Sequence, residues 1–114
     1  MNKQYRLKNS DEIGSIVTSR IRYYTKLYNM YYKKSEELKI AVVAGKKCGN
    51  SVKRNYEKRV MREIIRKKIN LLGNYNIVFV AREAVKDASY IDKEKDLDFL
   101  LNKLIERDSK HEKN

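Results

Sequence analysis

The hydrophobic and polar residues of this chain fall into segments that predict three helices and three strands. The first expected helix spans residues 9–18, where Ile13 and Val17 lie at helical spacing behind a capping-box pair. Residues 21–32 are rich in tyrosine and favour a strand, and residues 38–44 form a second strand that is β-branched and mostly apolar. We expect these two strands to pair as a hairpin, with the second one central in the sheet.

A long helix and a third strand are expected next. Asn50 or Ser51 is placed to cap a helix that runs to about Lys68. Residues 75–81 are apolar and follow a Gly-Asn turn, which predicts a buried strand. Because a long helix separates this strand from the strand over residues 38–44, the two should be parallel and joined by a crossover.

A helix over residues 89–107, capped by Ser89 or Asp92, completes the expected fold. Its buried stripe consists of aliphatic residues at helical spacing: Leu97, Leu100, Leu101, Leu104 and Ile105. The tail over residues 108–114 is polar and is expected to fray. The order helix, two strands, helix, strand, helix indicates a single α+β domain over residues 1–114, an α/β sandwich around one small mixed sheet.

The helix that begins near Asn50 carries two rows of side chains at i, i+4 spacing. The apolar row consists of Val52, Tyr56, Val60 and Ile64. The basic row consists of Arg54, Lys58, Arg62 and Arg66, with Asn55 and Arg59 beside it. Like charges at this spacing destabilise a helix by roughly 0.2–0.5 kcal/mol per pair, so the basic row favours a polyanionic partner. Lys46 and Lys47 precede the helix start, where backbone amides also attract anions.

The composition supports a polyanionic partner. Lys and Arg number 27 against 15 Asp and Glu, which gives a net charge of +12 on 114 residues. No apolar run approaches the roughly 20 residues that span a bilayer, and no apolar stretch follows the basic N-terminus, so neither a membrane protein nor a secretory signal is expected. The single cysteine, Cys48, cannot form an internal disulfide, which is typical of a cytoplasmic protein.

No catalytic residue or metal site is expected in the chain itself. The acidic residues of the last helix, Asp92, Glu94, Asp96 and Asp98, alternate with lysines at a helix start, and helix capping and solvation explain them. His111 has no obvious partner in the tail. Cys48 is interpreted as buried apolar filler. We therefore predict neither a cofactor bound by the protein alone nor a small-molecule substrate.

The basic segment carries a motif with a known counterpart. Residues 46–62, KKCGNSVKRNYEKRVMR, resemble the Lys-Lys-x-Gly-Asn-Ala-Val-x-Arg-Asn-Arg-x-Lys-Arg-x-x-Arg segment of the bacterial ribonuclease P protein family. The resemblance covers nearly the whole chain, since residues 5–8, 28–31 and 75–82 are similar to the family's N-terminus, first strand and last strand. It implies a left-handed βαβ crossover, against the usual hand.

The resemblance also implies a function. Family members bind a large catalytic RNA and the 5′ leader of precursor tRNA, and the complex removes that leader endonucleolytically. The RNA subunit and its bound Mg²⁺ carry out the hydrolysis, so the protein would act as the protein component of an endoribonuclease.

Individual positions follow from the same match. Positions in the family's RNA-contacting motif are Arg54, Asn55, Lys58, Arg59 and Arg62. Its flanking positions are Lys46, Lys47, Asn50 and Lys53, and the helical wheel alone adds Arg66. Its leader-binding cleft corresponds to Ile13, Val17 and Tyr31. Tyr56 replaces an arginine of the motif, Ile13 and Val17 replace two phenylalanines, and Tyr28 stands where phenylalanine is usual.

Two other classes of nucleic-acid-binding protein remain open at this point. A ribosome-associated or other structured-RNA-binding protein is compatible with the composition, and only the motif argues against it. A DNA-binding module would insert an exposed helix into the major groove. The helix after Asn50 has apolar residues around much of its circumference, which suits packing and shape recognition better.

Overall fold

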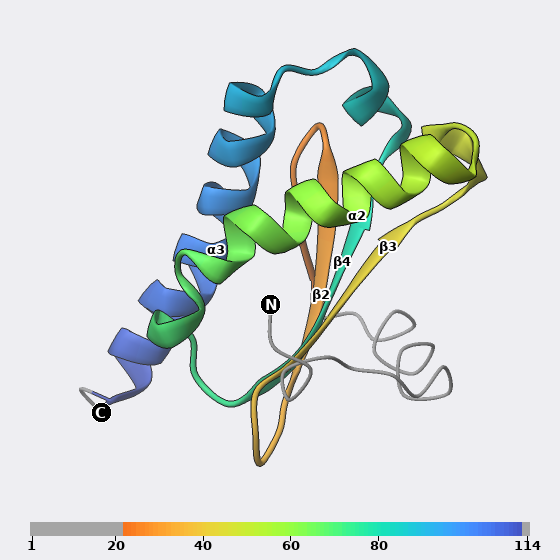
Figure 1. Cartoon of the computed structure of the whole chain (residues 1–114). Coiled ribbons are helices and arrows are strands. Elements are labelled where there is room, and N and C mark those ends of the chain that lie inside the picture. The colour runs from red at the N-terminus through yellow and green to blue at the C-terminus, as the bar shows by residue number, and fades with distance from the viewer. Residues whose placement is uncertain (1–21, 113–114) are drawn as a thin grey trace.

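The computed structural model describes residues 22–112, and the expected helix over residues 9–18 lies outside them. Four strands form one sheet: β1 (Arg22–Tyr24), β2 (Tyr28–Lys34), β3 (Lys39–Ala44) and β4 (Tyr75–Ala81). Two long helices, α2 (Ser51–Arg66) and α3 (Tyr90–Glu112), lie on one side of the sheet, with α2 crossing the strands and α3 beside it (Figure 1). Three short 3-10 turns connect these elements: η2 (Lys46–Cys48), η3 (Ile69–Leu71) and η4 (Glu83–Asp87). The α+β class is confirmed.

The strand order is β1-β2-β4-β3, so β4 lies between β2 and β3. β3 and β4 are parallel, as the crossover predicted, whereas β2 pairs with β4 in the antiparallel sense. The predicted hairpin between β2 and β3 is therefore wrong, and so is the central position of β3, which is an edge strand of the described sheet. β4 takes the interior place because Ile77, Val78 and Phe79 are fully buried, which requires cover on both faces of the sheet. The hand of the crossover stays a prediction.

The tyrosine-rich segment, expected as one strand, is a hairpin of two. Thr25 interrupts it: its backbone N–H donates to the Tyr28 carbonyl over 2.8 Å, and its hydroxyl accepts from the Tyr28 N–H over 3.1 Å. These bonds close the turn, and β1 then pairs antiparallel with β2 with Arg22 opposite Tyr31. The side-chain hydroxyl of Thr25 thus ends the first strand early.

The core lies between the helices and one face of the sheet. Alternate residues of the strands point to it: Tyr28, Met30, Tyr32, Ile40, Ile77 and Phe79. The helices contribute Val60, Met61, Ile64, Ile65, Leu97, Leu100, Leu101 and Leu104. The predicted stripe of α3 is confirmed for its leucines, and Ile105 is half-buried. α3 begins after Ser89, whose hydroxyl accepts from the Asp92 N–H, and it continues to Glu112, past the expected end near Arg107.

Tyr28 presents an unusual buried group, and its replacement by phenylalanine is expected to stabilise the protein. Its hydroxyl is fully buried and has no hydrogen-bond partner within the described chain. Burial, with Glu57 and Asp96 nearby, raises the pKa of Tyr28 above its ordinary value. Removing an unsatisfied buried hydroxyl recovers part of a penalty of about 1–3 kcal/mol, so Tyr28→Phe should increase the free energy of unfolding by roughly 1 kcal/mol in urea denaturation. Tyr32→Phe is the matched control and should destabilise instead, because the Tyr32 hydroxyl shares a hydrogen bond with Tyr23.

Candidate nucleic-acid interface

The start of α2 is fixed by a short glycine-bounded loop at the end of β3. Gly49 has a φ of 120°, a left-handed conformation that favours glycine, and a Cβ there would lie 2.8 Å from the Lys53 Cδ. Asn50 follows as the cap, and its Oδ1 accepts from the Lys53 N–H over 3.0 Å, as its position predicted. Lys46 and Lys47 lie exposed in η2, immediately before this cap. The loop therefore presents two cations and the first amides of α2 together.

The apolar row of α2 is only partly buried. Val60 and Ile64 lie in the core, but Val52 is 77% exposed and Tyr56 is 48% exposed. The predicted four-residue apolar face is thus wrong over its first half. Four residues turn an α-helix by more than one full turn, so an i, i+4 row drifts by about 40° per step and leaves the core direction within two steps.

The same drift moves the basic row from the flank of α2 to its solvent side. Arg54, Lys58 and Arg62 are half-buried along the flank, whereas Arg66 is exposed. Asn55 and Arg59 are also exposed and lie next to this row. We call the set the basic ridge, consisting of Arg54, Asn55, Lys58, Arg59, Arg62 and Arg66. The structure thus brings the motif residues together on the outer surface of one helix.

Most cations of the ridge are not neutralised. Among the side chains of residues 23–107, no carboxylate lies within ion-pair distance of Lys58, Arg59 or Arg66. Lysines just beyond the ridge are paired: Lys67 with Glu94 at 2.7 Å and Lys68 with Asp98 at 3.7 Å. The hydrogen bond that the Lys67 ammonium donates to Glu94 raises the pKa of Lys67. Acidic side chains of α3 therefore pair with the C-terminal end of α2, and Lys58, Arg59 and Arg66 stay available to an external anion.

A basic hollow of about 600 Å³ opens at the carboxyl ends of β3 and β4. Lys46 and Lys47 line it together with Arg82, which follows β4 directly. Arg82 also donates to the Thr25 carbonyl over 2.7 Å. Arg82 was not predicted as a site residue, although its place after a parallel strand was a usable signal, since the carboxyl ends of parallel strands meet at one edge.

Tyr31, which was predicted to line the leader-binding cleft, lies on a different surface. It is half-buried on the face of the sheet opposite α2, where it packs with Val78 and Ala41. Ile13 and Val17, the other predicted cleft residues, lie outside the described residues. Tyr31 and the basic ridge are therefore on two sides of the molecule, separated by the sheet.

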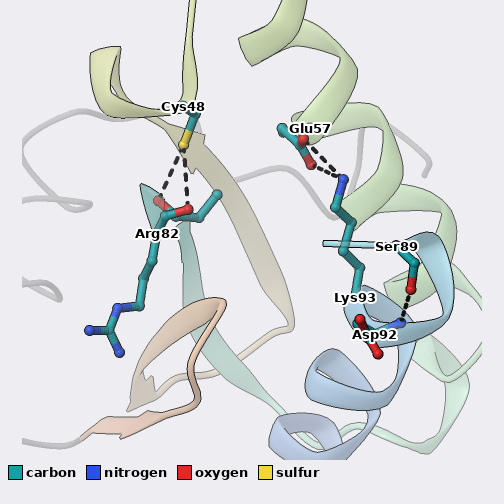
Figure 2. A network of polar contacts seen from close by, with 7 residues as sticks. Cys48, Glu57, Arg82, Ser89, Asp92 and Lys93 are labelled. Atoms are coloured by element: carbon teal, nitrogen blue, oxygen red, sulfur yellow. Dashed lines mark hydrogen bonds and ion pairs between the residues drawn. The ribbon is translucent and has the colours of Figure 1, made fainter. Parts of the chain in front are cut away.

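A buried ion pair joins α2 to α3 beneath the ridge. The Nζ of Lys93 lies 2.9 Å from Oε1 of Glu57 and donates to Oε2 over 3.0 Å (Figure 2). Both residues are at most 5% exposed. Neither residue was predicted to lie in the interior. No local pattern indicates this pair, because its two members lie 36 positions apart.

The remaining chemically reactive side chains have structural roles. Cys48 is buried, its thiol donates to the Ala81 carbonyl over 3.6 Å, and burial raises its pKa, so the prediction of apolar filler is confirmed (Figure 2). Asp96 accepts from the Leu27 N–H over 3.2 Å. Among the side chains described for residues 23–107, no three His, Cys, Asp or Glu residues are grouped to hold a metal ion. None of the helices in this range is both long and apolar enough to cross a membrane.

The fold and the ridge define a class: a small, basic α+β protein with a surface for polyanions. The family model of ribonuclease P matches residues 1–105. The ribonuclease P protein component of Mycoplasmopsis synoviae is 34% identical over 94 residues, which cover 82% of this chain and 83% of that protein. The component from Bacillus velezensis is 31% identical over 106 residues, covering 90% and 91%.

The fold agrees with solved structures of the same kind. A Staphylococcus aureus RNase P protein mutant with defective mRNA degradation activity superposes with a TM-score of 0.81 at 24% identity, covering 88% of this chain and 87% of that one. The chain belongs to the ribonuclease P protein family. It is thus a protein component of ribonuclease P, an RNA-binding protein of tRNA processing, and the ribosomal and DNA-binding alternatives are not favoured.

Proposed function

We propose that the basic ridge of α2 binds the catalytic RNA subunit of ribonuclease P and that the complex cleaves precursor tRNA at the end of its 5′ leader. The observation that carries this proposal is that Lys58, Arg59 and Arg66 have no carboxylate within ion-pair distance among the described side chains. Such cations release counterions when they meet phosphates, which supplies most of the affinity for nucleic acid. Lys46, Lys47 and Lys53 extend the same surface around the helix start. Asn50 uses its carbonyl oxygen for capping and keeps its amide for donation to a phosphate.

The leader of the precursor tRNA would lie on the other face of the sheet. Tyr31 is half-buried there and offers part of its ring to an unpaired base. Ile13 and Val17 would complete this cleft, as the family match implies. Two RNA surfaces on opposite sides of the sheet would let the protein hold the catalytic RNA and the substrate at once.

Hydrolysis is assigned to the RNA subunit with its Mg²⁺. The carboxylates of α3 are engaged in ion pairs and backbone contacts rather than grouped around one point. The described residues do not fit a metal cage, so we place the ion with the RNA. The protein would contribute affinity and positioning.

Reconstitution tests this function. Adding the full chain to the transcribed RNA subunit of the same organism should increase cleavage of precursor tRNA at low Mg²⁺, because the ridge offsets phosphate repulsion. The measurement is the rate at which the 5′ leader is released. The protein alone should release none. A mixture that cleaves no faster than RNA alone would refute the proposal.

A further inference from the structure

A second hollow, of about 470 Å³, lies between the first two turns of α2 and the segment that joins η4 to α3. Its size is within the range of pockets that hold small ligands. Cys48, Val52 and Ala88 make part of its wall apolar, and Tyr56 contributes its ring. No residue of the basic ridge lines it, and of the flanking positions predicted to bind RNA only Lys53 lies in its wall. It is therefore a separate feature on the side of α2 that was expected to be core.

The ring of Tyr56 is held in place before any partner arrives. The ammonium of Lys93 lies over it, 5.3 Å from the ring centroid, and the buried carboxylate of Glu57 holds that ammonium at 2.9 Å. The residue is nevertheless 48% exposed. A ring supported on one side and open to solvent is a preorganised stacking surface, because little side-chain entropy is lost when a partner binds.

The net charge of the residues that line the hollow indicates the charge of the ligand that it binds. Lys53, Lys86 and Lys93 line it against one carboxylate, Glu57, which leaves two positive charges. Lys86 has only a long, exposed contact with Glu83, at 3.8 Å. The lysines of the rim are thus available to an anion.

Two other hollows differ from the one at Tyr56. The hollow beside Leu27 has two lysines against Asp87, Asp92 and Asp96, so its net charge is negative. The hollow at Lys46, Lys47 and Arg82 is positive but has no aromatic side chain in its wall. Of these three, the Tyr56 hollow alone combines an open ring with positive charge, which is the combination that single-stranded nucleic acid requires.

We propose that the Tyr56 hollow takes an unpaired nucleotide of the RNA that α2 binds, with the base stacked on Tyr56 and the neighbouring phosphates on Lys53 and Lys86. This inference rests on the proposed function. It extends the RNA surface around α2, since Tyr56 lies one residue from Asn55 on the exposed turn of the helix. The family motif has an arginine at this position, so stacking here would be a property of this chain.

Binding of the RNA subunit by Tyr56 variants tests the stacking. Tyr56→Leu keeps an apolar side chain but removes the ring, and it should weaken binding roughly five- to 150-fold, since base stacking contributes about 1–3 kcal/mol. The slope of affinity against salt should not change, because no cation is lost. Tyr56→Phe should bind like the parent. Lys53→Ala and Lys86→Ala should each lower the slope by about one.

Phe99→Leu is the matched control. Phe99 is 50% exposed and has the Lys103 ammonium 5.1 Å from its ring, but it lines none of the three hollows. Equal effects of Tyr56→Leu and Phe99→Leu would overturn the proposal, as would a Tyr56→Phe variant as weak as Tyr56→Leu. Loss of binding in ridge variants alone would retain the proposed function and reject this site. No loss in either set would reject the function itself.

A direct measurement needs no variant. RNA subunit containing 4-thiouridine should cross-link to the full wild-type chain on irradiation, and mass spectrometry should locate an adduct at Tyr56. Adducts confined to the basic ridge and to the loop before α2 would contradict a base in the hollow. If poly-glutamate binding is weakened by Tyr56→Leu as strongly as RNA binding, the hollow belongs to an acidic protein segment and the proposal is wrong.

Discussion

Replacing Lys93 with methionine should lower the free energy of unfolding by about 3–5 kcal/mol. Lys93 and Glu57 are a buried pair with their charged atoms 2.9 Å apart, and removal of one partner leaves the other charge buried without compensation. A loss of this size is a large fraction of the stability of a small domain. Urea denaturation followed by circular dichroism measures it as a fall in the midpoint at a constant m-value.

Two controls identify the cause of that loss. Lys67→Met breaks the exposed pair with Glu94, whose 2.7 Å contact is shorter than the buried one, yet it should leave the free energy of unfolding nearly unchanged because water screens it. The double replacement Glu57→Leu with Lys93→Met should recover most of the loss, since two apolar side chains leave no buried charge. If Lys93→Met and Lys67→Met were equally mild, the pair would not be a structural anchor of α2.

Replacing Arg59 and Arg62 together with alanine should weaken binding of the RNA subunit about a hundredfold. Each arginine can supply a charge-assisted hydrogen bond to phosphate, about 1.5–3 kcal/mol, which corresponds to tenfold or more. Two lost phosphate contacts should also reduce the slope of log affinity against log salt by about two. A filter-binding titration between 50 and 200 mM salt would measure both quantities.

The control for the Arg59 and Arg62 variant removes two positive charges from another part of the protein. Lys95 and Lys103 lie on α3 and outside the ridge, and their joint replacement by alanine should reduce the slope much less. Arg62 is half-buried and makes contacts within the protein, so unfolding of both double variants should be compared before their affinities are interpreted. An unchanged slope in the Arg59 and Arg62 variant would mean that the ridge does not contact phosphate.

Local signals in the sequence predicted the elements that depend on neighbouring residues. The Asn50 cap, the Ser89 cap and the strand over residues 75–81 are confirmed, because caps and apolar runs act within a few positions. Strand pairing was predicted wrongly, since adjacency along the chain favoured a hairpin between β2 and β3, whereas burial on both faces places β4 between them. Which strands neighbour each other depends on contacts between residues far apart in the chain.

For the candidate site too, the sequence predicted local features and missed those that depend on contacts between distant residues. The motif located the ridge, but a wheel of ideal rows could not show that Val52 and Tyr56 extend past the core. The exposure of these two side chains depends on where the sheet ends beneath α2. The Glu57–Lys93 pair could not be predicted either, because a glutamate and a lysine 36 residues apart carry no periodic signal.

The interior position of β4 has a consequence for the order in which the protein matures during synthesis. The hairpin of β1 and β2 can close early, but β3 has no partner in the described sheet until β4 emerges from the ribosome. α2, synthesised between β3 and β4, therefore has no completed sheet to pack on when its last residue is made. The position of the ridge relative to the sheet is therefore fixed only after residue 81 has been synthesised.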